Sequence, residues 1–129
     1  MTIKAVLTVS DHHEMVTIHR AIMELKRVTN PSDAALVGSP ILAKFSNRLL
    51  DAIIQYEEEN FGSDRATRWE EWRMIDESRT EWSQMKQHIE NVDNWSQMPL
   101  FQKREYVKNL ASPFVLKDAQ VEFLICIQD

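Results

Sequence analysis

The sequence has very few of the residues that cross-link a chain or form its tight turns. Its 129 residues include one cysteine, Cys126, together with two glycines and four prolines. A single thiol excludes an internal disulfide and a cysteine-ligated zinc site, and it is typical of a reducing compartment. So few glycines also disfavour the glycine-rich loops that bind phosphate groups, and we predict that the chain carries no cofactor.

Long hydrophobic runs and a basic amino-terminal segment are also missing. No apolar run approaches the roughly 20 residues that a membrane-spanning helix requires. The 20 acidic residues outnumber the 15 basic ones, which gives a formal net charge of −5. This charge disfavours nonspecific binding to nucleic acid or to an acidic membrane surface. We therefore predict a cytoplasmic protein with no membrane partner.

Helical periodicity dominates the middle of the chain. Hydrophobic residues make up 43% of the sequence and charged residues 27%, a composition that predicts one compact domain over residues 1–129. Apolar residues recur at helical spacing in four segments bounded by capping or helix-breaking residues. The predicted helices cover residues 12–29, 40–61, 63–92 and 99–110, with a further helical turn at residues 34–37. The third is the longest, because residues 63–92 contain neither glycine nor proline.

Both ends of the chain alternate apolar and polar residues, as half-buried strands do. This alternation predicts strands over residues 3–9 and 121–127, and a short apolar run predicts another at residues 114–116. Because short strands are unstable alone, we expect residues 3–9 to pair with a strand within residues 114–128. The predicted fold class is α+β and mostly helical, with about four helices packed on a small sheet of two to three strands.

Three histidines, His12, His13 and His19, crowd the first predicted helix, but their spacing does not suit a metal ion. Two histidines that bind one metal from a helix stand four residues apart, as in zinc proteases. No pair among these three has that spacing. We therefore predict capping or surface roles for them, a surface position for His88, and no metal site.

Acidic residues offer two further hypotheses. Glu90 and Asp93 would supply half of the acidic set that binds magnesium in small helical pyrophosphohydrolases, but the matching pair on a preceding helix is missing. The glutamates at residues 57–59 lie where a predicted helix ends, so their charge opposes the helix dipole. Either they form a partner-binding patch, or Arg65 and Arg68 neutralise them from the next helix. No complete catalytic set emerges, and we predict no catalytic residue.

The four tryptophans are the most distinctive feature of the sequence. Trp72 and Trp82 share the apolar stripe of the third predicted helix, and we expect both in the core. Trp69 lies beside this stripe and Trp95 lies after the helix, so we expect both to be partly exposed. Indoles and arginines are enriched at the centres of protein interfaces, which predicts a partner-binding surface here. Its predicted contacts are Trp69, Glu70, Arg73 and Trp95.

These features favour a non-enzymatic protein-interaction module, such as an inhibitor, immunity protein, antitoxin or adaptor. Its partner is expected to be another protein, and a homodimer through the terminal strands is a further expectation. The small size also suggests a phage or mobile element as the source. The first alternative is a small enzyme, or a small-ligand or nucleotide-binding protein that uses acidic residues.

A second alternative is a nucleic-acid-associated regulator. It rests on a small basic face formed by Lys103, Arg104 and Lys108 beside Tyr106 in the fourth predicted helix. The acidic net charge weighs against it, so nucleic acid is not the expected partner.

Overall fold

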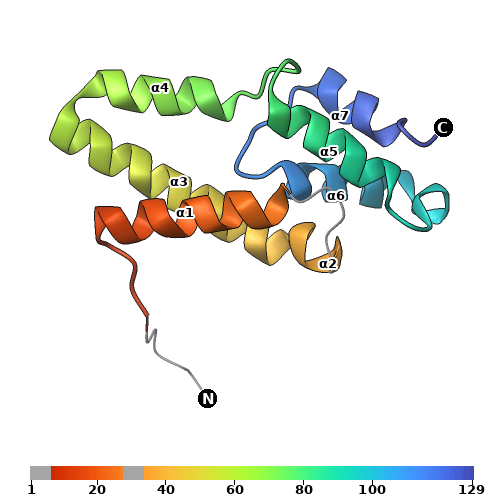
Figure 1. Ribbon diagram of the computed structural model, residues 1–129, viewed down its shortest axis with the longest axis horizontal. Helices are drawn as coiled ribbons and strands as arrows, with labels where there is room; N and C mark the ends of the chain where they lie inside the picture. The colour runs from red at the N-terminus through yellow and green to blue at the C-terminus, as the bar shows by residue number, and fades with distance from the viewer. Residues whose placement is uncertain (1–6, 28–33) are drawn as a thin grey trace.

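The computed structural model describes residues 7–27 and 34–129, which form helices joined by turns and short loops (Figure 1). The long helix α3 crosses the molecule, with α1 beside it and α4 folding back above it. The helices α5, α6 and α7 gather at the other end of the molecule. The elements are α1 (His12–Lys26), α2 (Ala34–Val37), α3 (Pro40–Phe61), α4 (Ser63–Arg73), α5 (Thr80–Glu90), the 3₁₀ turn η1 (Trp95–Gln97), α6 (Leu100–Ala111) and α7 (Asp118–Ile125).

The boundaries of α3 confirm the helix predicted over residues 40–61. Ser39 caps its start, because the side chain accepts hydrogen bonds from the backbone N–H groups of Ile41 and Leu42. Pro40 occupies the first turn, where its missing N–H costs nothing. Gly62 ends the helix with a φ of 97°, a left-handed conformation that disfavours side-chain-bearing residues. This sharp end lets α4 fold back along α3.

The other predicted helices are confirmed in part. The turn at residues 34–37 is α2, and α6 matches the segment predicted over residues 99–110. Asp11 caps α1 by accepting a hydrogen bond from the N–H of Glu14. The described part of α1 ends at Lys26, and residues 28–29 of the prediction lie outside the described residues.

The single long helix predicted over residues 63–92 is wrong, because the chain turns between α4 and α5. At this turn the backbone N–H of Ser78 donates to a carboxylate oxygen of Asp76 at 2.7 Å. Arg79 then takes an extended conformation before α5 begins at Thr80. Asp and Ser side chains stabilise such turns without glycine or proline. Two helices therefore replace one.

The predicted sheet is also wrong, and the described residues are helical rather than α+β. Residues 118–125 form α7, in which Val121, Leu124 and Ile125 face the core at helical spacing. Near residues 114–116 the structure has one isolated parallel bridge, between Val115 and Met74. Residues 7–10 form no strand, and residues 3–6 lie outside the described residues. A short apolar run fits both periodicities, which is why alternation misled the prediction.

The largest hydrophobic cluster lies between α5, α6 and α7 and contains Trp82, Met85, Val107 and Leu124. Trp95 is its most deeply placed aromatic residue, with only 1% of its surface exposed. Its indole N–H donates to the carbonyl oxygen of Ile125 at 3.0 Å. The expectation that Trp95 is partly exposed is therefore wrong, whereas the core position expected for Trp82 is confirmed.

Two cations at the end of α1 bind the carboxyl end of α6. The ammonium of Lys26 donates to the carbonyl oxygens of Asn109 and Ser112, each at 2.6 Å. The guanidinium of Arg27 donates to the carbonyl oxygens of residues 110 and 111, each at 3.1 Å. These oxygens lack helical partners and carry the negative end of the helix dipole. Burial, together with the charge of Arg27, lowers the pKa of Lys26 to about 7.

We expect Lys26→Met to lower the free energy of unfolding by about 2 kcal/mol or more, because two buried carbonyl oxygens lose their donor. Urea denaturation at constant pH measures the change. The control is Lys44→Met on the exposed face of α3, which should leave the unfolding midpoint unchanged. A Lys26→Met variant as stable as the wild type contradicts the role of this contact.

We expect Trp95→Ala to cost about 3 to 5 kcal/mol of stability, as for other large-to-small changes in a packed core. Trp95→Phe should cost less, about 1 to 3 kcal/mol, since it keeps much of the ring but leaves the Ile125 carbonyl without its donor. Denaturant unfolding monitored by circular dichroism tests both values. If Trp95→Ala unfolds at the same denaturant concentration as the wild type, the Trp95 indole does not stabilise this part of the core.

Candidate functional site

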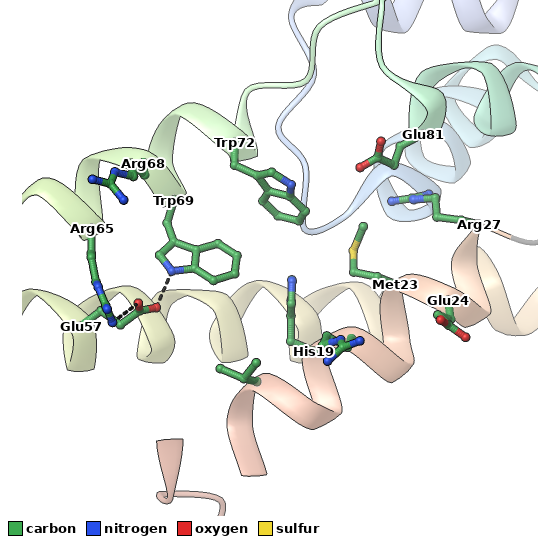
Figure 2. Close-up of a pocket in the computed structure, with 12 residues that line it drawn as sticks. His19, Met23, Glu24, Arg27, Glu57, Arg65, Arg68, Trp69, Trp72 and Glu81 are labelled. Carbon is green, nitrogen blue, oxygen red and sulfur yellow. Dashed lines mark hydrogen bonds and ion pairs between the residues drawn. The ribbon is translucent and has the colours of Figure 1, made fainter. Parts of the chain in front are cut away.

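A cavity of about 780 Å³ lies between α1, α3, α4 and the start of α5. We call it the α1–α4 pocket. Figure 2 shows side chains entering it from α1 on one side and from α4 on the other. Its lining residues are Val16, His19, Arg20, Met23, Glu24, Arg27, Glu57, Arg65, Arg68, Trp69, Trp72 and Glu81.

The pocket has an aromatic wall made by two residues of α4 and one of α1. The rings of Trp69 and Trp72 meet edge to face with centroids 5.5 Å apart. His19 points from α1 toward both (Figure 2), at 5.5 Å from Trp69 and 5.4 Å from Trp72. Trp72 is half-buried, so it serves the pocket as well as the neighbouring core. The Trp72 indole N–H forms no hydrogen bond with any described residue.

His19 is only 4% exposed, so the surface or capping role predicted for it is wrong. Burial against the two indoles lowers its pKa below the usual 6.5. His12 stacks on Tyr56 with ring centroids 4.6 Å apart. The predicted surface position of His88 is also wrong, because this residue is buried and its ring nitrogen lies 2.6 Å from the Tyr106 hydroxyl. His13 is exposed.

Glu57 is the buried carboxylate of the pocket, with 7% of its surface exposed. It accepts a hydrogen bond from the indole N–H of Trp69. Its other oxygen lies 3.5 Å from the guanidinium of Arg65, which also covers the ring of Phe61. The hypothesis that Arg65 and Arg68 neutralise the glutamates at residues 57–59 therefore holds for one pair only, Arg65 with Glu57, because Glu58, Glu59 and Arg68 form no ion pair among the described residues. The hairpin at Gly62 brings the two helices close enough for that contact.

Arg27 closes the pocket near α5 (Figure 2) and is 8% exposed. Its Nη atoms bind the end of α6, while its buried Nε has no hydrogen-bond partner among the described residues. Burial lowers the pKa of Arg27 to about 10, against the opposing effect of the nearby Glu81 charge. Glu81 itself pairs with Arg79, at 2.6 Å.

Arg20 and Arg68 differ from the other arginines of the pocket. Both line it from opposite helices, α1 and α4, and both are exposed. Neither forms an ion pair or a hydrogen bond with another described residue. Glu24 is exposed at the same pocket and has no ion pair in the described ranges either. The pocket therefore presents two cationic groups whose charge is open to a ligand.

Of the four predicted partner contacts, the structure brings Glu70 and Arg73 into an ion pair of 3.9 Å but does not gather all four on one surface. Trp69 lines the α1–α4 pocket, whereas Glu70 lines a second cavity of about 410 Å³ between α3 and α4. Arg73 is largely covered and binds Asp51 at 2.8 Å. Trp95 is buried in the core between α5, α6 and α7. Of the four, Trp69 alone lies in the larger pocket.

Sequence reasoning did not identify the pocket residues of α1. His19, Arg20, Met23 and Arg27 reach the pocket because α1 lies across from α4. The residue pattern of α1 alone does not indicate that α4 lies across from it. The one available signal was a cation-rich stretch at residues 20–27 within an amphipathic helix.

We expect the wild type to lose stability relative to a His19→Phe variant as the pH falls from about 7 to about 5. In that range the unfolded chain gains a proton on His19, while the buried imidazole resists protonation. Unfolding free energies measured across this range test the sign, and His88 contributes equally to both proteins. The exposed-site variant His13→Gln should follow the wild type. Parallel curves for wild type and His19→Phe contradict the prediction.

Metal-binding clusters and membrane-spanning helices are both missing from the described ranges. No group of three His, Cys, Asp or Glu side chains there is arranged to hold a metal ion. Every helix within residues 7–27 and 34–129 is too short or too polar to cross a lipid bilayer. Comparison with known protein families, curated proteins and solved structures finds no match for this chain.

Proposed function

We propose that this chain is a protein-interaction module that receives side chains of a partner protein in the α1–α4 pocket. The observation that carries the proposal is the combination of two indoles with two unpaired arginines in one open cavity. Trp and Arg are the residues most enriched among those that dominate binding energy at protein interfaces. Inhibitors, immunity proteins, antitoxins and adaptors remain the classes that we propose.

The chemistry of the lining residues supports binding more than catalysis. The twelve lining residues include no serine, threonine, cysteine or lysine that could act as a nucleophile. The buried carboxylate, Glu57, is already engaged by Trp69 and Arg65. His19 is enclosed by indoles and lacks the paired acid or base that general catalysis requires.

The proposal includes a location in the cytoplasm. Cys126 is a free, exposed thiol, and exposed thiols persist best in a reducing compartment. An acidic protein with one thiol is compatible with that environment.

Small-ligand binding is the second candidate. The pocket volume of about 780 Å³ falls within the range of about 300 to 1,000 Å³ that is usual for small-molecule sites. Aromatic walls with a few polar groups are also typical of such sites. A protein partner is preferred because the pocket is open at its arginine-bearing edge, where both Arg20 and Arg68 are exposed.

Selection of peptides from a random phage-display library against the purified full chain tests the proposal without knowledge of the natural partner. We expect enriched peptides whose affinity falls about thirtyfold, or about 2 kcal/mol, on Trp69→Ala. Arg68→Glu is the second pocket variant, because this exposed residue can change without loss of folding. The control is Phe101→Ala, an exposed aromatic residue of α6 outside the pocket.

Peptides that bind both pocket variants as well as the wild type would place recognition on another surface. A library that yields no pocket-dependent peptide, with a small molecule retained by the purified protein, would favour the second candidate instead. Circular dichroism of each variant separates lost binding from lost folding.

A further inference from the structure

The charges around the α1–α4 pocket do not balance once internal contacts are counted. Four arginines and three glutamates line it. Glu57 is engaged by Arg65 and the Trp69 indole, and Glu81 is engaged by Arg79 from outside the lining set. Among the exposed charged residues of the pocket without an internal partner, only Glu24 then remains against the charges of Arg20 and Arg68. The open part of the pocket is therefore cationic.

Within the described ranges, the pocket also has more hydrogen-bond donors without partners than free acceptors. Arg20, Arg68 and the Trp72 indole have N–H donors without partners among the described residues. The Nε of Arg27 is a further donor without a partner among the described residues, while the Nη atoms of this buried guanidinium bind the end of α6. Most of the acceptors, in contrast, are already used. A ligand that fits this arrangement must supply acceptors and negative charge.

The remaining surface of the pocket favours a flat or bulky apolar group. Val16 and Met23 of α1 line it together with the two indoles of α4. Burial keeps His19 neutral, so the imidazole acts as part of the aromatic wall. An aromatic ring can pack edge to face or offset against such a wall. Charge and apolar surface thus meet in one cavity.

We infer that the α1–α4 pocket recognises a carboxylate joined to an aromatic or large apolar group, as presented by an acidic residue beside an aromatic residue of a partner protein. This inference rests on the proposed function and specifies the chemistry of the partner. The arginines of α1 and α4 bind the carboxylate, and the indole wall packs against the apolar group. A guanidinium is well suited to this task because it can donate two parallel hydrogen bonds to a carboxylate.

Three small probes that share one ring and differ in charge test the inference on the full chain. They are 2-naphthylacetate, the neutral 2-naphthylacetamide and the cationic 2-(2-naphthyl)ethylamine. Dissociation constants come from calorimetry, and chemical shifts of the indole N–H groups in NMR spectra locate the binding. We expect the acetate to bind at least about fivefold more tightly than the amide, with the amine weakest.

The variant Arg20→Gln/Arg68→Gln should reduce the preference for the acetate over the amide to less than about twofold, since neutral donors replace both charges. Arg48→Gln is the matched control, because Arg48 is an exposed arginine of α3 outside the pocket. Raised salt should weaken the acetate more than the amide.

An amide that binds as tightly as the acetate, or an amine that binds most tightly, overturns the inference about charge. In that case the peptide selection still decides the proposed function independently. Failure of all three probes to shift the Trp69 or Trp72 signals also overturns the inference. Pocket-dependent peptides without acidic residues would do the same while leaving the interaction proposal intact.

Discussion

The structure depends on the contact between the end of α1 and the end of α6. Lys26 and Arg27 supply cationic donors to a row of carbonyl oxygens that a helix cannot satisfy within itself. Met23 of α1 adds an apolar contact with the core at the far end of the molecule. Since α1 also carries His19, Arg20 and Met23, the contact between α1 and α6 joins the α1 wall of the α1–α4 pocket to the end of α6, while the apolar face of α1 packs against α3.

Arginine has two different roles around the pocket, and position decides which one each residue takes. Arg27 is buried and bound by carbonyl oxygens of α6, whereas Arg65 is exposed and pairs with the buried carboxylate of Glu57. Arg20 and Arg68 lie one residue away from an inward-facing aromatic residue, so the helix turns them to the edge of the cavity. The same short segments therefore provide both the support of the pocket and the charge that a ligand would meet.

Local signals predicted part of the fold and little of the site. The Ser39–Pro40 start and the Gly62 end of α3 depend on neighbouring residues alone, and they were predicted correctly. The turn after α4 was missed because Asp76 and Ser78 form it without glycine or proline. Residues 121–127 fit a strand or a helix equally, and only packing against α6 decides between them. The burial of Trp95 and the pocket position of His19 depend on helices distant in sequence, which no local pattern encodes.

The sequence separation between the two cations at the end of α1 and their acceptor carbonyls has a consequence for folding during synthesis on the ribosome. The acceptor carbonyls lie 83 to 86 residues after the two cations. At about 5 to 20 residues per second, synthesis of that interval takes roughly 4 to 17 seconds. Throughout this time both cations stay hydrated, while α1 can already pack against α3 and α4. The carboxyl end of the first helix to be made thus gains its contact with α6 only after almost all of the chain has been translated.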